Sequence, residues 1–389
     1  MRGAPRSMTR SRSRLRRARK VGERVASQVF PLPVLRTHAD PRIDADWVAR
    51  GECADHGTGV ELPIAQPRAL IDGHGRTVDH LRLSVTSACN LRCLYCRPSP
   101  HGASCRNDLT DEQRLEIVEY LYARRGLRQL RLTGGEPLLH STIVSLIARI
   151  RELAPALSLA MTTNGYRLAS MARALRDAGL DRLNISLDVI DSVRYRSLTG
   201  GCLDDVVQGI DAAVAAGFPP PKLNAVVLSG INEGELAGIA RWAFARSLEI
   251  RFLEAMPIGP AAGFNRRHFV PASRIRRRLE SRFVLSAMRR NSGETAARYR
   301  AESPDQSGIL GIIAPLSESF CGQCRRMRLT ADGRLFPCLL DTRSVNLNDC
   351  RQNGRLVPER VDELIEAAVR GKNASGSLYQ DSPMIALGG

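Results

Sequence analysis

Three cysteines fall within eight residues of this chain. Cys89, Cys93 and Cys96 stand in SVTSACNLRCLYCRPSP with a C-x3-C-x2-C spacing, and no fourth cysteine completes the set nearby. A structural zinc site is closed by four protein ligands, commonly arranged in two pairs. Three thiolates on a cubane of four irons leave one iron open to an exogenous ligand. The spacing therefore favours an iron–sulfur cluster with an open iron, and zinc or chance clustering are the alternatives.

A second set of three cysteines lies near the C-terminus. Cys321, Cys324 and Cys338 follow a C-x2-C-x13-C spacing in CGQCRRMRLTADGRLFPC. A zinc ribbon would need a fourth ligand, which Cys350 or His268 could supply. The other interpretation is a second cubane whose open iron is available to the substrate.

Two arginines directly follow the second cysteine pair. Arg326 and Arg328 are two residues apart, so on an extended strand their side chains point to the same face. Paired guanidinium groups suit the recognition of phosphate. The alternative is an exposed basic face of a hairpin.

Composition bounds the class of protein. The chain has 389 residues, which is enough for one large or two smaller α/β domains, and no run of eighteen apolar residues. Six of its ten cysteines form the two sets, whereas Cys53, Cys105, Cys202 and Cys350 are single. Clustered cysteines in a chain of this size predict bound metal in a reducing compartment, hence a cytoplasmic protein, rather than a secreted disulfide framework.

The net charge of +17 is concentrated at one end. Residues 1–30 contain ten Lys and Arg and a single Glu. This stretch is either an organelle-targeting peptide or an unstructured extension, and the second interpretation is favoured. The remaining positive charge suits an anionic small substrate such as a nucleotide. A nucleic-acid-binding iron–sulfur or zinc protein is a competing hypothesis, but no recognition motif with interleaved aromatic residues is present.

The elements that must position these residues alternate along the chain from about residue 80. Strand-like segments span 81–86, 127–137, 157–165, 181–188, 221–230 and 248–256. Helix-period segments span 111–124, 140–153, 167–178, 204–216 and 233–247. Six such units predict a parallel sheet, and each polar cluster lies at a strand's C-terminal end, where α/β folds build sites.

The alternation fades after residue 257. A short basic helix is predicted at 274–283, a strand, cysteine turn and hairpin over 308–340, and a last helix near 360–370. The predicted organisation is a basic and largely disordered extension (1–68), a barrel domain (69–257) and a C-terminal region with a Gly-Gly tail (258–389).

The first cysteine set resembles that of the radical SAM superfamily, in which an aromatic residue precedes the last cysteine, as Tyr95 does here. The resemblance implies that S-adenosylmethionine (SAM) binds the open iron and yields a 5′-deoxyadenosyl radical. It extends to GGEP, TTNG, NISLD and EAM at later strand ends. The residues it assigns to the cofactor are Tyr95, Gly134, Gly135, Glu136, Thr163, Asn164, Ser186 and Met256, with Met256 packing on the adenine.

Residues from about 69 to 389 resemble the GTP 3′,8-cyclases of molybdenum-cofactor biosynthesis. The motifs are GHGRTVDHLRLSVT, RLTGGEPLL, RFLEAMPIG, the second cysteine block and the terminal Gly388-Gly389. The resemblance implies an incomplete (β/α)6 barrel, two [4Fe–4S] clusters on the six clustered cysteines, and the guanine of GTP on the second cluster. The radical would take hydrogen from C3′ of the ribose, and the carbon radical would attack C8 of the purine.

The same resemblance implies a set of substrate-binding residues and partners. The substrate-binding residues are Arg82, Arg131, Thr133, Lys222, Arg251, Arg326 and Arg328, and the Gly388-Gly389 tail would enter the active site. No catalytic side chain is implied beyond the clusters. The product would pass to the cyclic pyranopterin monophosphate synthase, electrons would come from a flavodoxin or ferredoxin, and the enzyme would be a homodimer that binds neither nucleic acid nor membrane.

Four positions depart from the family pattern: Ser87, Ala88, Arg97 and Gln129. Gln129 stands where a lysine is expected, which removes one phosphate contact. These departures leave open a diverged radical SAM enzyme that acts on another nucleotide or on a peptide. A fold that has lost activity is opposed by the two intact cysteine sets.

Overall fold

The computed structural model describes residues 67–96, 108–291 and 293–374, which belong to one compact unit. Nearly all of the predicted N-terminal extension, together with Arg97 and the Gly388-Gly389 tail, lies outside the described residues. The domain boundary predicted at residue 257 stays a prediction. Within the described ranges, no helix has both the length and the apolar character needed to cross a membrane.

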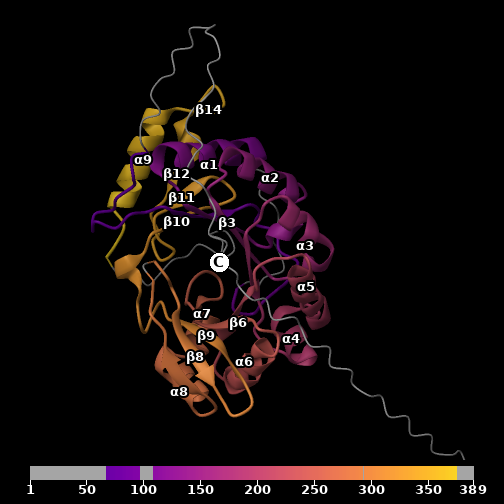
Figure 1. The fold of residues 1–389 in the computed structure, drawn as a ribbon. Coiled ribbons are helices and arrows are strands. Elements are labelled where there is room, and N and C mark those ends of the chain that lie inside the picture. Colours follow the sequence, from indigo (N-terminus) through magenta and orange to yellow (C-terminus); the bar gives the residue numbers. More distant parts are fainter. Residues whose placement is uncertain (1–66, 97–107, 292, 375–389) are drawn as a thin grey trace, which may run out of the picture. The chain divides into compact units, whose positions relative to one another are not determined.

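Six parallel strands run in the predicted order, each paired with the next. They are β1 (His80–Ser84), β2 (Gln129–Thr133), β3 (Ser158–Thr163), β4 (Arg182–Ser186), β5 (Lys222–Val227) and β6 (Glu249–Glu254). The intervening helices are α1 (Asp111–Arg125), α2 (Ile143–Leu153), α3 (Leu168–Asp177), α5 (Leu203–Ala215) and α6 (Leu236–Phe244). The α/β prediction is confirmed, and α4 (Ser192–Thr199) is an addition between β4 and α5. Figure 1 shows α1, α2, α3 and α5 in succession along the outer side of the strands.

Apolar and polar side chains alternate along these strands between two faces. Leu81 and Leu83 of β1 are buried in one core with apolar residues of the surrounding helices, as are Leu130 and Leu132 of β2. Because successive strand residues point to opposite faces, the intervening arginine of each strand points to the inner side. The leucines thus fix the strands against the helices and leave a polar interior.

The C-terminal region extends this sheet at both edges. β9 (Ser307–Ile313) pairs in parallel with β6, and β10 (Arg326–Leu329) pairs in parallel with β1. Antiparallel strands continue outward on each side: β7 (Val284–Ala287), β8 (Ala297–Glu302), β11 (Arg334–Phe336) and β12 (Val345–Asn346). Residues 314–325 therefore connect the two opposite edges and must cross the open side of the partial barrel. Figure 1 shows β8 and β9 well apart from β10 and β11.

The remaining elements are short, apart from the last helix. They are α7 (Ala262–Arg267), α8 (Ala272–Glu280), α9 (Pro358–Arg370), the hairpin β13 (Arg351–Gln352) and β14 (Arg355–Leu356), and the 3-10 turns η1 (Pro137–Leu139), η2 (Glu233–Glu235), η3 (Cys321–Gln323) and η4 (Leu347–Cys350). The basic helix and the last helix predicted from the sequence correspond to α8 and α9. The strands β7 and β8 and the helices α4 and α7 were not predicted, because each is short and carries little periodicity.

One buried carboxylate fixes the segment that crosses the open side. Glu254, at the end of β6, accepts hydrogen bonds from the backbone N–H groups of Ala272, Leu316 and Ser317 at 2.9–3.2 Å. It also accepts one from the Ser317 hydroxyl. The end of β6, the start of α8 and the beginning of the crossing segment are therefore held at one point.

Helix α9 returns the chain to α1 through polar contacts. The buried Arg125 of α1 donates to Asp362 at 3.3 Å and to Glu366 at 2.7 Å, and the Tyr120 hydroxyl donates to Asp362 at 2.5 Å. Because α9 precedes residues 371–374, these contacts also set where that last described segment begins.

We expect Arg125→Ala to lower the free energy of unfolding by about 1–3 kcal/mol, because it leaves two carboxylates without their buried partner. Denaturant unfolding followed by circular dichroism measures this loss. Arg124→Ala is the matched control, since Arg124 is an exposed neighbour on the same helix. Equal losses in the two variants would contradict a specific role for Arg125.

Candidate active site

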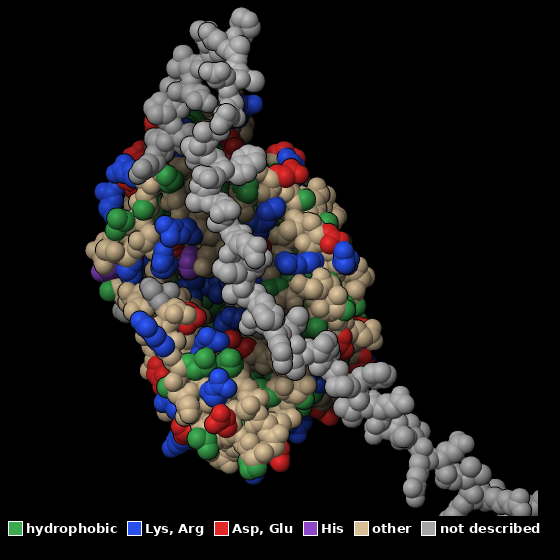
Figure 2. All heavy atoms as spheres, in the orientation of Figure 1, with side chains coloured by type: hydrophobic (Ala, Val, Ile, Leu, Met, Phe, Trp, Pro, Cys, Tyr) green, Lys and Arg blue, Asp and Glu red, His purple; other side chains and the backbone are tan. Residues whose placement is uncertain are grey.

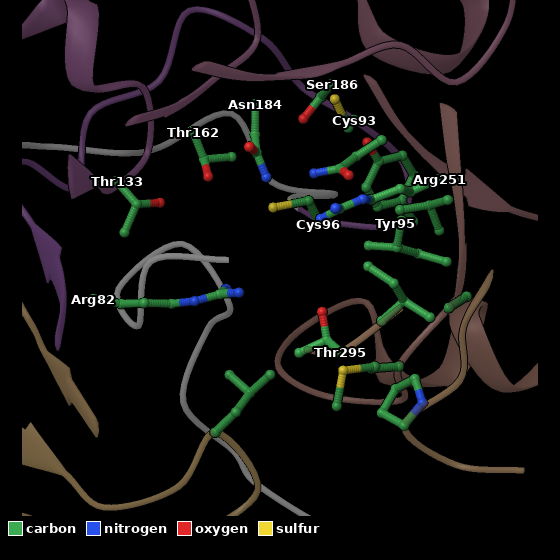
Figure 3. A pocket seen from close by; sticks show the side chains of 18 of the residues that line it. Arg82, Cys93, Tyr95, Cys96, Thr133, Thr162, Asn184, Ser186, Arg251 and Thr295 are labelled. Atoms are coloured by element: carbon green, nitrogen blue, oxygen red, sulfur yellow. The ribbon is translucent and has the colours of Figure 1, made fainter. Parts of the chain in front are cut away.

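A cavity of about 320 Å³ lies where the parallel strands end, and all six cysteines of the two triads line it. Figure 3 shows Arg82 extending into this cavity, with Thr133, Thr162, Asn184 and Ser186 following one another round its wall. The other predicted residues that line it are Tyr95, Gly134, Gly135, Glu136, Thr163, Asn164 and Met256 of the cofactor set, and Arg131, Arg251, Arg326 and Arg328 of the substrate set. Residues from most of the strands, far apart in sequence, thus meet in one place.

The loop that leads into the first triad rests on two glycines. The Gly135 N–H donates to the Thr86 carbonyl and the Glu136 N–H donates to the Ala88 carbonyl, each at 2.8 Å. A Cβ on Gly135 would lie 2.1 Å from the Ala88 carbonyl oxygen, and one on Gly134 would lie 2.4 Å from that of Thr86. The missing side chains of Gly134 and Gly135 therefore make room for the backbone of Thr86 and Ala88. The contact of these glycines with a cofactor stays a prediction. Because Ala88 makes these contacts through backbone atoms, its departure from the family pattern leaves them unchanged.

Glu136 joins the ends of β2 and β3. Its buried carboxylate accepts hydrogen bonds from the Thr163 hydroxyl at 2.6 Å, the Asn164 N–H at 2.7 Å and the Leu138 N–H at 3.0 Å. Burial raises the pKa of Glu136 to about 7, although these hydrogen bonds oppose the rise. Both oxygens are thus engaged within the protein, and they hold Thr163 and Asn164 at the cavity wall.

Tyr95 is held at both ends. Its hydroxyl donates to Asp188 at 2.7 Å, and its backbone carbonyl accepts from the Asn265 side chain at 2.9 Å. Burial raises the pKa of Asp188 to about 6. These contacts tie the residue before the third thiol to β4 on one side and to α7 on the other.

The second triad is supported by basic residues from both ends of the chain. Arg76 donates to the Cys321 carbonyl at 2.6 Å and to the Asn373 carbonyl at 2.8 Å. The buried Lys372 donates to the carbonyls of Arg326 at 2.6 Å and Cys324 at 3.3 Å. The cysteine loop, the start of the described chain and residues 372–373 therefore form one hydrogen-bonded group.

The thiols of each triad lie close enough to affect one another. At the first triad, burial followed by the charges of Asp188, Cys96 and Cys89 raises the pKa of Cys93. At the second triad burial raises the pKa of Cys324, but Arg326 and Lys372 outweigh it and lower the pKa to about 6. A nearby guanidinium and ammonium stabilise a thiolate, which is the form that binds iron.

The donor set fits two cubanes better than zinc. Cys350 is buried in the apolar core, and His268 lies against Phe264 with its Nδ1 on the Ser229 carbonyl, so neither lines the cavity as a fourth ligand. No three His, Cys, Asp or Glu side chains of the described chain converge tightly enough to hold a single metal ion. Three thiolates without a fourth protein ligand suit a cubane that leaves one iron open.

Three arginines of the inner face lie at one level of the sheet. Arg82 is in register with Arg131 on one neighbouring strand and with Arg328 on the other. Burial, followed by the charges of the neighbouring arginines, lowers the pKa of all three, to about 10 for Arg131 and Arg328. Among the described residues Arg82 forms no ion pair. Such a cluster favours a polyanion, which would relieve the mutual repulsion.

Lys222 is the one predicted substrate residue outside this cavity. It lines an adjoining cavity of about 280 Å³ near the amino ends of the strands, as does Gln129. Arg82, Arg131, Arg251 and Arg326 line both cavities. The basic interior is therefore continuous, and Lys222 stands at its far end. Figure 2 shows lysine and arginine side chains around the hollow at the centre of one face.

Sequence reasoning missed several residues that support the site: Arg76, Asp188, Glu254, Asn265 and Lys372. Arg76 and Asp188 stand inside motifs that carried the family resemblance, GHGR and NISLD, so the motifs gave a signal for them. Lys372 and Asn265 lie in stretches without periodicity, and their burial follows only from the fold.

Comparisons with known proteins agree with this site. Residues 83–243 match the profile of the radical SAM superfamily, and residues 248–378 match that of the molybdenum cofactor synthesis C-terminal family. A GTP 3′,8-cyclase of Corynebacterium glutamicum is 38% identical over 90% of this chain and 97% of its own length. GTP 3′,8-cyclase 1 of Pseudomonas aeruginosa is 42% identical over 78% of this chain and 92% of its own.

The solved structures that match are more distant in sequence. Streptococcus suis SuiB bound to its precursor peptide SuiA has a TM-score of 0.54 and 13% identity, and the match covers 77% of this chain and 66% of SuiB. SuiB bound to S-adenosylmethionine has a TM-score of 0.52, and the match spans 64% of that chain. At this identity the likeness shows the shared fold alone.

We expect Gly135→Ala to lose the iron of the first triad, because the added methyl group would displace the Ala88 carbonyl and the loop behind it. The variant should retain about half of the wild-type iron after anaerobic reconstitution. The control is Gly322→Ala in the second loop, where an added Cβ meets no atom within 4 Å. Full iron in Gly135→Ala would show that the loop tolerates the shift.

Tripolyphosphate should stabilise the protein by binding the buried arginines. At a hundredfold excess over its dissociation constant it would add about 2.7 kcal/mol, a shift of a few degrees in Tm at constant ionic strength. Arg82→Met should unfold no earlier than wild type without the anion, because it removes a positive charge that lies between Arg131 and Arg328, and should lose most of the shift. Arg300→Ala, an exposed arginine on β8, should keep the shift. An undiminished shift in Arg82→Met would refute the assignment.

Proposed function

Because the chain belongs to the GTP 3′,8-cyclases of the radical SAM superfamily, we propose that it converts GTP to 3′,8-cyclo-7,8-dihydro-GTP, an early step of molybdenum-cofactor biosynthesis. One observation carries the proposal: two thiol triads and a cluster of inner-face arginines line the same cavity. Such a lining suits three groups, namely a source of radicals, a second metal centre and a triphosphate.

Cys89, Cys93 and Cys96 would hold a [4Fe–4S] cluster and would leave one iron for SAM. When bound, this cluster and SAM would supply a 5′-deoxyadenosyl radical, and C3′ of the ribose would be the source of the hydrogen atom that it takes. The side chains and backbone of this protein position the reacting groups. Gly135 and Glu136 fix the backbone that leads into the triad, Thr163, Asn164 and Ser186 bound the wall beside it, and Met256 meets the adenine.

Cys321, Cys324 and Cys338 would hold a second [4Fe–4S] cluster, which would bind the guanine base. Arg326 lies beside this triad, with its Nη2 3.5 Å from the Cys324 sulfur. The inner-face arginines and Lys222 bind the triphosphate, which would run from the main cavity toward the adjoining one. With both ends of GTP held, the ribose between them stays next to the radical, and this fixed geometry lowers the entropic cost of the attack on C8.

The interior position of the site protects the radical. The strands surround the cavity, and the segment held by Glu254 crosses its open side. Exclusion of water limits side reactions of a reactive intermediate. The Gly388-Gly389 tail, which lies outside the described residues, is proposed to enter the active site.

The wider setting follows from the proposed reaction. The product would be consumed by the cyclic pyranopterin monophosphate synthase, and a flavodoxin or ferredoxin would supply the electron. The enzyme would work as a cytoplasmic homodimer, and its barrel domain and C-terminal region would meet near residue 257.

The decisive experiment is GTP-dependent formation of 5′-deoxyadenosine by the anaerobically reconstituted enzyme with SAM and a reductant. GTP should raise the yield and should appear as the cyclised product, whereas ATP should do neither. Cys338→Ala should keep SAM binding and lose cyclisation. Cyclisation at the wild-type rate in Cys338→Ala, or a yield that GTP leaves unchanged, would overturn the proposal.

A further inference from the structure

Asn265 joins two walls of the cavity through one amide nitrogen. It lies on α7, and its side chain is 1% exposed. Its Nδ2 donates to the Tyr95 carbonyl at 2.9 Å and to the Met256 carbonyl at 2.7 Å. One of these carbonyls precedes the third thiol of the first triad, and the other belongs to the residue proposed to meet the adenine.

The oxygen of the same amide is unsatisfied. Asn265 lines the cavity, and within the described ranges its buried Oδ1 has no hydrogen-bond donor. An unpaired buried acceptor costs about 1–3 kcal/mol, so such a group in a binding site indicates a donor that arrives with the ligand.

The chemistry of this corner selects the donor. Three acceptors lie around Asn265: its own Oδ1 and the carbonyls of Tyr95 and Met256, and the Asn265 amide already engages the two carbonyls. A neutral ligand group with N–H donors and no acceptor of its own complements such a corner. The exocyclic amine of adenine is such a group, whereas hypoxanthine presents a carbonyl oxygen at the same ring position.

We propose that Asn265 recognises the exocyclic amine of the adenine of SAM through Oδ1, while Nδ2 keeps the Tyr95 and Met256 carbonyls in place. This inference rests on the proposed function, because that function places the adenine against Met256. Asn265 then sets the base specificity of the cofactor site, in addition to positioning the residue before Cys96.

The test compares two unreactive ligands that differ at one purine position. S-adenosylhomocysteine carries the amine, and S-inosylhomocysteine carries a carbonyl oxygen instead. Anaerobic calorimetry on the reconstituted full-length enzyme measures both dissociation constants. Wild type should bind the adenosyl ligand about tenfold more tightly, as expected when a hydrogen bond is replaced by two facing acceptors. In Asn265→Ala the ratio should fall to about twofold or less.

The ratio of the two dissociation constants distinguishes recognition of the amine from a merely structural role of Asn265. If Asn265 acts only by positioning, Asn265→Ala weakens both ligands and leaves the ratio at its wild-type value, and the proposal is wrong. Asn224→Ala is the matched control, because Asn224 also lines the cavity with an unpartnered buried Oδ1 but lies on β5; it should keep the ratio. If Asn265→Ala does not fold, Asn265→Ser replaces it, with circular dichroism and iron content as checks.

The same measurement distinguishes this inference from the proposed function. Wild type that binds neither ligand would contradict the SAM site itself. Wild type that binds both equally tightly would leave the SAM site standing and refute the role of Asn265.

Discussion

The pairing of β10 with β1 and of β9 with β6 determines the rest of this structure. β9 and β10 are close in sequence but lie at opposite edges of the six-stranded core. The residues between β9 and β10 therefore have to cross the open side of that core. The first triad follows β1 along the chain and the second sits on the crossing segment and beside β10. Two parallel pairings thus bring two cysteine sets that are distant in sequence to one cavity.

The polar interior sets a balance between stability and binding. The outer leucines of β1 and β2 hold the strands in the core, and this fixes Arg82 and Arg131 on the inner side whether or not an anion is present. Bringing like charges together in a poorly solvated space costs free energy, which the apolar core must offset. A bound polyphosphate would relieve this repulsion, so these arginines would add to the stability of the protein when the anion is present.

The sequence predicted the parts of the site that leave a local pattern. The six strands, their helices and the cysteine spacings were all readable, because periodicity and motif spacing are properties of neighbouring residues. The pairing of Arg82 with Arg328 joins residues 246 positions apart, and β10 is only four residues long, so it looked like one arm of a hairpin. Asn265 and Lys372 are single polar residues whose burial depends on the complete fold. The contact of Gly134 and Gly135 with the cofactor stays a prediction, whereas their packing against the cysteine loop, which the structure shows, was not predicted.

The contacts of Arg76 constrain the order in which parts of the protein can fold during synthesis. This residue precedes the first strand, yet its guanidinium binds carbonyls of Cys321 and Asn373, and Lys372 supports the same loop from the other end of the chain. While the chain is still emerging from the ribosome, the first triad and its glycines are already synthesised, but the second triad lacks its supports. The loop of the second triad therefore gains its full set of contacts only after translation has passed the last helix, and a chain truncated before that point would lack the contacts of Lys372 and Asn373.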